Sequence, residues 1–71
     1  MPVEIRSEVA GTVFQVDVSA GTRVAAGDTL LILESMKMEI PVDAPRDGTV
    51  AKVAVAEKEV VNVGQVLLVL E

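Results

Sequence analysis

The chain repeats itself, and this internal repeat limits the possible folds more than any other feature of the sequence. A shift of 37 positions places residues 11–34 over residues 48–71 without a gap, and eleven of these 24 pairs are identical. The identical pairs are Gly11/Gly48, Thr12/Thr49, Val13/Val50, Val16/Val53, Val18/Val55, Val24/Val61, Gly27/Gly64, Leu30/Leu67, Leu31/Leu68, Leu33/Leu70 and Glu34/Glu71. Self-similarity at a fixed period marks a duplicated structural unit. We therefore expect a scaffold with approximate two-fold symmetry.

The repeat also divides the whole chain into parts. The same register extends backwards through the pairs Val3/Ile40 and Ile5/Val42. Residues 3–34 and 40–71 are then two copies of one unit, and residues 1–71 form one small domain. Residues 35–39 belong to neither copy, so this connecting hairpin is the first candidate for function.

Each copy has the residue pattern of short β-strands. Apolar and polar side chains alternate in Val16-Asp17-Val18, and Val, Ile, Thr and Leu are frequent throughout. No stretch keeps a helical period for three turns. The expected strands are 3–6, 11–18, 23–25 and 29–34 in the first copy, and 40–43, 48–55, 60–62 and 66–70 in the second.

Eight short strands in two equal halves predict an all-β fold, a flattened antiparallel barrel or sandwich. Four strands alone cannot bury their apolar face, so we expect the two copies to intertwine around one core made of the repeated Val, Leu and Ile positions. An Asp at Val16 or Val53 is predicted to unfold that core.

Glycines at equal places in the two copies predict turns with unusual backbone geometry. Gly27 and Gly64 are such a pair, and a positive φ is the conformation that glycine adopts at least cost. Gly21 has no glycine partner, because Lys58 stands at the matching position. If Lys58 keeps a positive φ, the turn costs on the order of 1 kcal/mol.

Composition excludes several classes of function. The chain has no cysteine or histidine, which removes disulfides, thiol nucleophiles and the usual zinc ligands. A net charge of −5 and a single aromatic residue, Phe14, argue against nucleic acid as a partner. No secretory signal opens the chain, and the apolar run Val66–Leu70 is too short to span a membrane. We expect a cytoplasmic protein with no membrane partner.

The connecting hairpin breaks the local rules that the rest of the chain obeys. Its centre is Met36-Lys37, whereas tight hairpin turns take Asn-Gly or Asp-Gly, because both central residues need a positive φ. Such an exception is typical of a functional site. Lys37 would then stand at an exposed tip between Met36 and Met38. The alternative is that both methionines alternate into the core as ordinary strand residues.

Glu34-Ser35-Met36-Lys37-Met38-Glu39 resembles the biotin-attachment motif of the biotinyl/lipoyl domain family, whose usual core is Ala/Ser-Met-Lys-Met. The resemblance covers nearly the whole chain and includes the segments Leu30–Leu33, Asp47–Val50 and Val61–Leu70. It implies the family's barrel-sandwich fold, with the modified lysine on the hairpin that joins two pseudo-symmetric halves. The absence of a Pro/Ala-rich leader and of a thumb insertion makes the chain more similar to the short, free-standing biotin carboxyl carriers. The alternative is the excised terminal domain of a longer carboxylase. Met1 and the tight fit of the two copies favour a complete, free-standing protein, which is what we expect.

The resemblance implies a role for Lys37 and for the residues around it. A biotin protein ligase would attach biotin covalently to Lys37. A biotin carboxylase would load the arm, and a carboxyltransferase would pass the carboxyl group to an acceptor, typically an acyl-CoA. The chain would be a carrier and not an enzyme, with no catalytic residue and no metal. The candidate ligase-recognition residues are Glu34, Ser35, Met36, Met38 and Glu39.

Two other functions stay open at this point. A lipoyl carrier has the same fold, but lipoyl domains usually place Asp before the lysine, where this chain has Met36. An unmodified docking module would use Met36 and Met38 as a small apolar tip.

Glu34 and Glu39 are either recognition residues or solvated charges at strand ends. The repetition of Glu34 as Glu71 favours the structural interpretation for Glu34.

Overall fold

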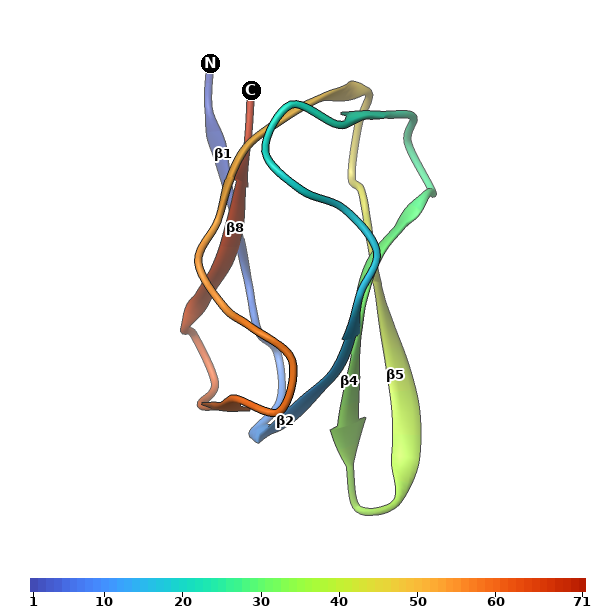
Figure 1. The fold of residues 1–71 in the computed structure, drawn as a ribbon, viewed down its shortest axis with the longest axis vertical. Coiled ribbons are helices and arrows are strands. Elements are labelled where there is room, and N and C mark those ends of the chain that lie inside the picture. Colours follow the sequence, from blue (N-terminus) through green and yellow to red (C-terminus); the bar gives the residue numbers. More distant parts are fainter.

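The computed structural model describes all 71 residues and contains eight strands and no helix (Figure 1). The strands are β1 (Val3–Arg6), β2 (Gly11–Val16), β3 (Arg23–Val24), β4 (Thr29–Ser35), β5 (Met38–Asp43), β6 (Gly48–Val53), β7 (Val60–Val61) and β8 (Val66–Leu70). They form two four-stranded sheets, in the orders β1-β8-β6-β3 and β5-β4-β2-β7. Every pairing is antiparallel, so the predicted all-β sandwich is confirmed.

The sheet orders carry the symmetry of the repeat. The 37-residue shift turns β1 into β5, β8 into β4, β6 into β2 and β3 into β7, and so converts one sheet order into the other. Each sheet therefore contains two strands from each copy, and the expected intertwining is confirmed. Neither copy has a sheet of its own, which is why one copy has no core without the other.

The core consists of the apolar positions that the repeat predicts. Nine side chains are less than 2% exposed, namely Leu30, Leu31, Leu33, Leu67, Leu68, Leu70, Val13, Val50 and Val61. Val16 and Val53 are half-buried and pack against this cluster. The unfolding effect of an Asp at these two positions stays a prediction.

Several strand ends differ from the predicted ones. β2 and β6 end at Val16 and Val53, two residues earlier than expected. After each of these residues, one more backbone hydrogen bond joins the chain to the neighbouring strand, and the chain then leaves the sheet. These bonds run from Asp17 N to Leu30 O, 3.0 Å, and from Ala54 N to Leu67 O, 2.8 Å. β3 and β7 each lack the last expected residue. β4 and β5 are longer than expected, since pairing continues to Ser35 and Met38.

The turn conformations follow the sequence pattern. Gly21, Gly27 and Gly64 have φ values of 94°, 90° and 86°. Lys58, the partner of Gly21 in the repeat, has a φ of 74°, so the turn keeps the geometry of the first copy although its residue is not glycine. This left-handed geometry is unfavourable for an L-residue, so the turn is strained at Lys58 in the second copy but not at Gly21 in the first.

The two ends of the molecule are different. Val3 pairs with Leu70, so the chain termini lie side by side at one end, and the β4–β5 hairpin extends at the opposite end (Figure 1). In the repeat, the β8–β1 pair is the equivalent of that hairpin. The chain contains no helix that is long and apolar enough to cross a membrane.

Candidate attachment site

A two-residue turn closes the β4–β5 hairpin. Ser35 pairs with Met38 and Glu34 with Glu39, which leaves only Met36 and Lys37 unpaired at the tip. Their φ values are 53° and 63°. Two consecutive positive φ values are those of the type I′ turn, whose twist matches that of the strands. The predicted departure from normal turn chemistry is therefore real, because neither residue is Gly, Asn or Asp.

The side chains of the tip are exposed to solvent. Met36 is 88% exposed and Met38 is 59% exposed. The alternative in which both methionines enter the core is wrong, because the end of the hairpin has no apolar layer to cover it. Lys37 is exposed as well, and its amine takes part in none of the side-chain hydrogen bonds or the single ion pair of the molecule.

The base of the hairpin is held firmly. The Ser35 Oγ donates a hydrogen bond to the carbonyl oxygen of Ala10, 3.0 Å away. Gly11 lies so close to β4 that a Cβ on it would collide with the carbonyl oxygen of Glu34. Ser35 is half-buried, so its hydroxyl has a structural role, while its part in ligase recognition stays a prediction. The tip is thus mounted on a rigid base.

Two carboxylates face each other just behind the tip. Glu34 and Glu39 are directly opposite in the β4–β5 register, and both are exposed. Like charges in this arrangement destabilise a strand pair. The only ion pair of the molecule joins Arg6 to Glu4, so no cation compensates this repulsion. The two carboxylates therefore place negative charge at the base of the tip, one on each strand of the hairpin.

The two rival lysines lie in different settings. Lys52 is on strand β6, and Lys58 is in the turn before β7. Both are exposed, but neither stands on a protruding hairpin or beside a methionine. Among the three lysines, Lys37 alone combines exposure with a projecting, rigid support.

Sequence reasoning missed the residues that brace the tip. The sequence identifies Gly11 only as a repeated glycine, and it gives no signal at Ala10. Gly48 is equally close to the carbonyl oxygen of Glu71, so the repetition of this glycine signals a close approach of two strands in each copy. The chain has no group of three or more acidic, histidine or cysteine side chains that is placed to hold a metal ion.

A family model and several known proteins resemble this chain, and they agree with one another. The model described as "Biotin-requiring enzyme" matches residues 1–70. The "Biotinylated protein TB7.3 homolog" of Mycobacterium leprae is 43% identical over 70 residues, which is 99% of this chain and 99% of that protein. The "Biotin/lipoyl attachment protein" of Bacillus subtilis is 48% identical over 61 residues, which is 86% of this chain and 84% of that protein.

Larger proteins contain a similar segment. The pyruvate carboxylase of Bacillus subtilis is 44% identical over 70 residues, and the match covers 99% of this chain but 6% of that enzyme. A solved single-chain, multi-domain long-chain acyl-CoA carboxylase has a segment that superposes with a TM-score of 0.91 at 36% identity, over 97% of this chain and 7% of that chain. The chain therefore belongs to the biotin/lipoyl attachment family.

Proposed function

We propose that this chain is a biotin carboxyl carrier in which Lys37 is the residue that bears biotin. The observation that carries the proposal is the position of Lys37 at the tip of a rigid, protruding hairpin, exposed and free of hydrogen bonds. An attachment residue must enter the active sites of other enzymes, so it must project beyond the body of its own domain. The similarity to biotinylated proteins and to carboxylases supports the same conclusion.

The residues at the tip fit a covalently attached biotin. In the attachment reaction, the Lys37 amine attacks the carbonyl carbon of biotinyl adenylate, an amide forms and AMP leaves. Met36 and Met38 offer soft apolar contacts beside the amine, which suit recognition by a partner surface. Bound biotin supplies a ureido nitrogen that can hold a carboxyl group. The chain itself supplies reach and a high local concentration of that group.

The partners follow from this role. A biotin protein ligase would recognise the hairpin, with Glu34, Ser35, Met36, Met38 and Glu39 as candidate contacts. A biotin carboxylase and a carboxyltransferase would then use the arm in turn, with an acyl-CoA as the acceptor. The chain would act as a carrier without catalysis of its own, in the cytoplasm, where biotin and ATP are available to the ligase.

The test is biotin transfer to the purified chain by a biotin protein ligase with ATP and biotin, followed by intact mass measurement. The wild type and the matched controls Lys52→Arg and Lys58→Arg are expected to gain one biotin. Lys37→Arg is expected to gain none. Biotin on the Lys37→Arg variant, or none on the wild type, would contradict the proposal.

Lipoate is the second candidate cargo, favoured by the similarity to a biotin/lipoyl attachment protein. The same fold and the same exposed lysine would serve a lipoyl carrier. A lipoyl ligase assay on the wild type and on Met36→Asp distinguishes the two. If Met36 selects biotin, the variant loses biotin transfer and gains lipoyl transfer.

A further inference from the structure

We infer that the pocket between β1 and β5 holds the bicyclic ring of the biotin carried on Lys37 of the same molecule. This inference rests on the proposed function and deepens it, because it gives the arm a resting place on its own carrier. It is carried by the position of the pocket, by its lining and by the length of the arm.

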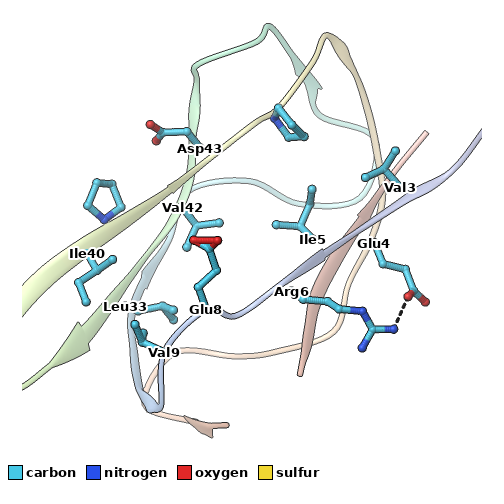
Figure 2. A pocket seen from close by; sticks show the side chains of 12 residues that line it. Val3, Glu4, Ile5, Arg6, Glu8, Val9, Leu33, Ile40, Val42 and Asp43 are labelled. Atoms are coloured by element: carbon cyan, nitrogen blue, oxygen red, sulfur yellow. Dashed lines mark hydrogen bonds and ion pairs between the residues drawn. The ribbon is translucent and has the colours of Figure 1, made fainter. Parts of the chain in front are cut away.

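The pocket lies where the two sheets fail to close. β1 and β5 are edge strands of different sheets, and both line the same cavity of about 370 Å³. This volume is within the range of about 300–1,000 Å³ that is usual for ligand pockets. Figure 2 shows Val9, Leu33 and Ile40 together at one end of the pocket, and the Glu4–Arg6 ion pair at the other end.

An apolar path connects the hairpin tip with this pocket. Successive side chains of a strand point to opposite faces, so Met38, Ile40 and Val42 share one face of β5. Ile40 and Val42 line the pocket and are half-buried, while Met38 lies beyond its edge and is 59% exposed. Only this end of the pseudo-symmetric pocket is served by a lysine hairpin, because the chain termini occupy the equivalent place at the other end (Figure 1).

The arm has the length that the path requires. Ile40 follows Lys37 by three positions, which is about 10 Å along an extended strand. A lysine side chain extended by an amide and four methylenes has a reach of roughly 13 Å from its Cα, since about eleven bonds of about 1.5 Å in a zigzag chain each advance about 1.2 Å. The ring therefore reaches the end of the pocket formed by Val9, Leu33 and Ile40.

The pocket chemistry matches both sides of the ring. The sulfur-containing ring is apolar and fits against the half-buried aliphatic side chains of Val9 and Ile40, beneath which Leu33 is buried. The ureido group offers N–H donors, and Glu8 on the pocket lining is an exposed carboxylate without a cation partner. A hydrogen bond from an N–H to a charged acceptor is stronger than one between neutral groups.

Charge on the lining makes the site selective for the unloaded ring. Glu8 and Asp43 both line the pocket, while the charge of Arg6 is paired with Glu4. A carboxyl group on the ureido nitrogen would replace the N–H donor with a negative charge beside Glu8. Repulsion between the two charges would release the loaded arm to solvent.

The test is NMR spectroscopy of the full chain with and without biotin, with intact mass measured on each sample. We expect NOEs from the ring protons to the methyl groups of Val9 and Ile40, and shift changes at those methyls. Glu8→Gln, a substitution at an exposed site that preserves folding, is expected to lose most of the NOE intensity. The control Glu57→Gln, which lies outside the pocket, is expected to keep it.

The outcomes separate this inference from the proposed function. If the mass shows biotin on Lys37 but shift changes stop within residues 35–39 and the ring shows no NOE to Val9 or Ile40, the docked arm is wrong and the carrier function stands. Unchanged NOEs in Glu8→Gln would overturn the role of its carboxylate. A chain that a biotin protein ligase leaves unmodified would overturn the carrier function and the docked arm together.

Discussion

At the scale of single residues, positive φ values mark both the structural turns and the candidate site. Met36, Lys37 and Lys58 are the only residues other than glycine with this conformation. Lys58 has no visible use for it, since its repeat partner Gly21 makes the same turn without strain. Met36 and Lys37 keep the strain at the tip, where an Asn-Gly pair would relieve it but would remove the lysine.

The turn at Lys58 gives a direct test of this strain. Lys58→Gly is expected to raise the free energy of unfolding by roughly 0.5–1 kcal/mol, because glycine takes a φ near 74° at less cost. Urea denaturation measures the change. Lys58→Ala is the control, because it removes the same charge but keeps the strained conformation. A Lys58→Gly variant no more stable than Lys58→Ala would refute this account.

At the scale of elements, the hairpin differs from its symmetry mate mainly at its end. The β4–β5 and β8–β1 pairs occupy equivalent places, and each is approached closely by a glycine, Gly11 or Gly48. The first pair is a continuous hairpin with Lys37 at its end, whereas the second is open at the chain termini. The fold thus contains two equivalent strand pairs, and only the β4–β5 pair ends in a turn that contains the lysine.

This difference predicts unequal effects of two equal substitutions. Gly11→Ala and Gly48→Ala each place a Cβ against a carbonyl oxygen, and each is expected to lower the free energy of unfolding by about 1–3 kcal/mol. Only Gly11→Ala displaces the base of the hairpin, so it alone is expected to slow biotin transfer at a temperature where both variants remain folded. Equal transfer rates for the two variants would show that a rigid base is not needed.

At the scale of the whole molecule, two copies share one core, and stability is expected to be shared equally between them. Leu30 and Leu67 are repeat partners and both are fully buried. Truncation of a buried leucine costs about 2–5 kcal/mol. A domain of this size has roughly 4–11 kcal/mol of stability in total, at about 0.05–0.15 kcal/mol per residue. Either truncation therefore threatens the fold.

The prediction is that Leu30→Ala and Leu67→Ala lower the unfolding free energy by amounts that agree within about 1 kcal/mol. Both measurements use urea denaturation followed by far-UV circular dichroism, and the two variants act as controls for each other. A large loss for one variant and a small loss for its partner would mean that the copies do not share a single cooperative core.

The sequence predicted most of this architecture because each structural position occurs twice in the repeat, so its residue type can be compared between the two copies. Val13 and Val50, or Leu33 and Leu70, are each buried in the same way, so the duplicated pattern identifies the core without knowledge of the fold. Comparison with Gly21 identified Lys58 as a position where a positive φ would be strained, and the structure shows that Lys58 has this φ. Strand ends were harder, since the separation of the chain after Val16 depends on neighbouring strands and not on local residue types.

Features built from both copies could not be read from the sequence. The pocket is made by the edges of β1 and β5, and its carboxylate Glu8 stands where the second copy has Pro45. The support of the hairpin by Ala10 and Gly11 depends on which strand lies beside β4. Both require the sheet order, which the residue pattern of a single copy does not contain.

The central claim is that Lys37 carries biotin, and the most direct measurement is the intact mass of the protein purified from its own cells, followed by peptide mapping. The account predicts a mass increment of one biotin, located on the peptide that contains Lys37. A lipoyl increment at Lys37 would move the protein to the second candidate function. An unmodified Lys37, in cells with active biotin and lipoyl ligases, would contradict the account.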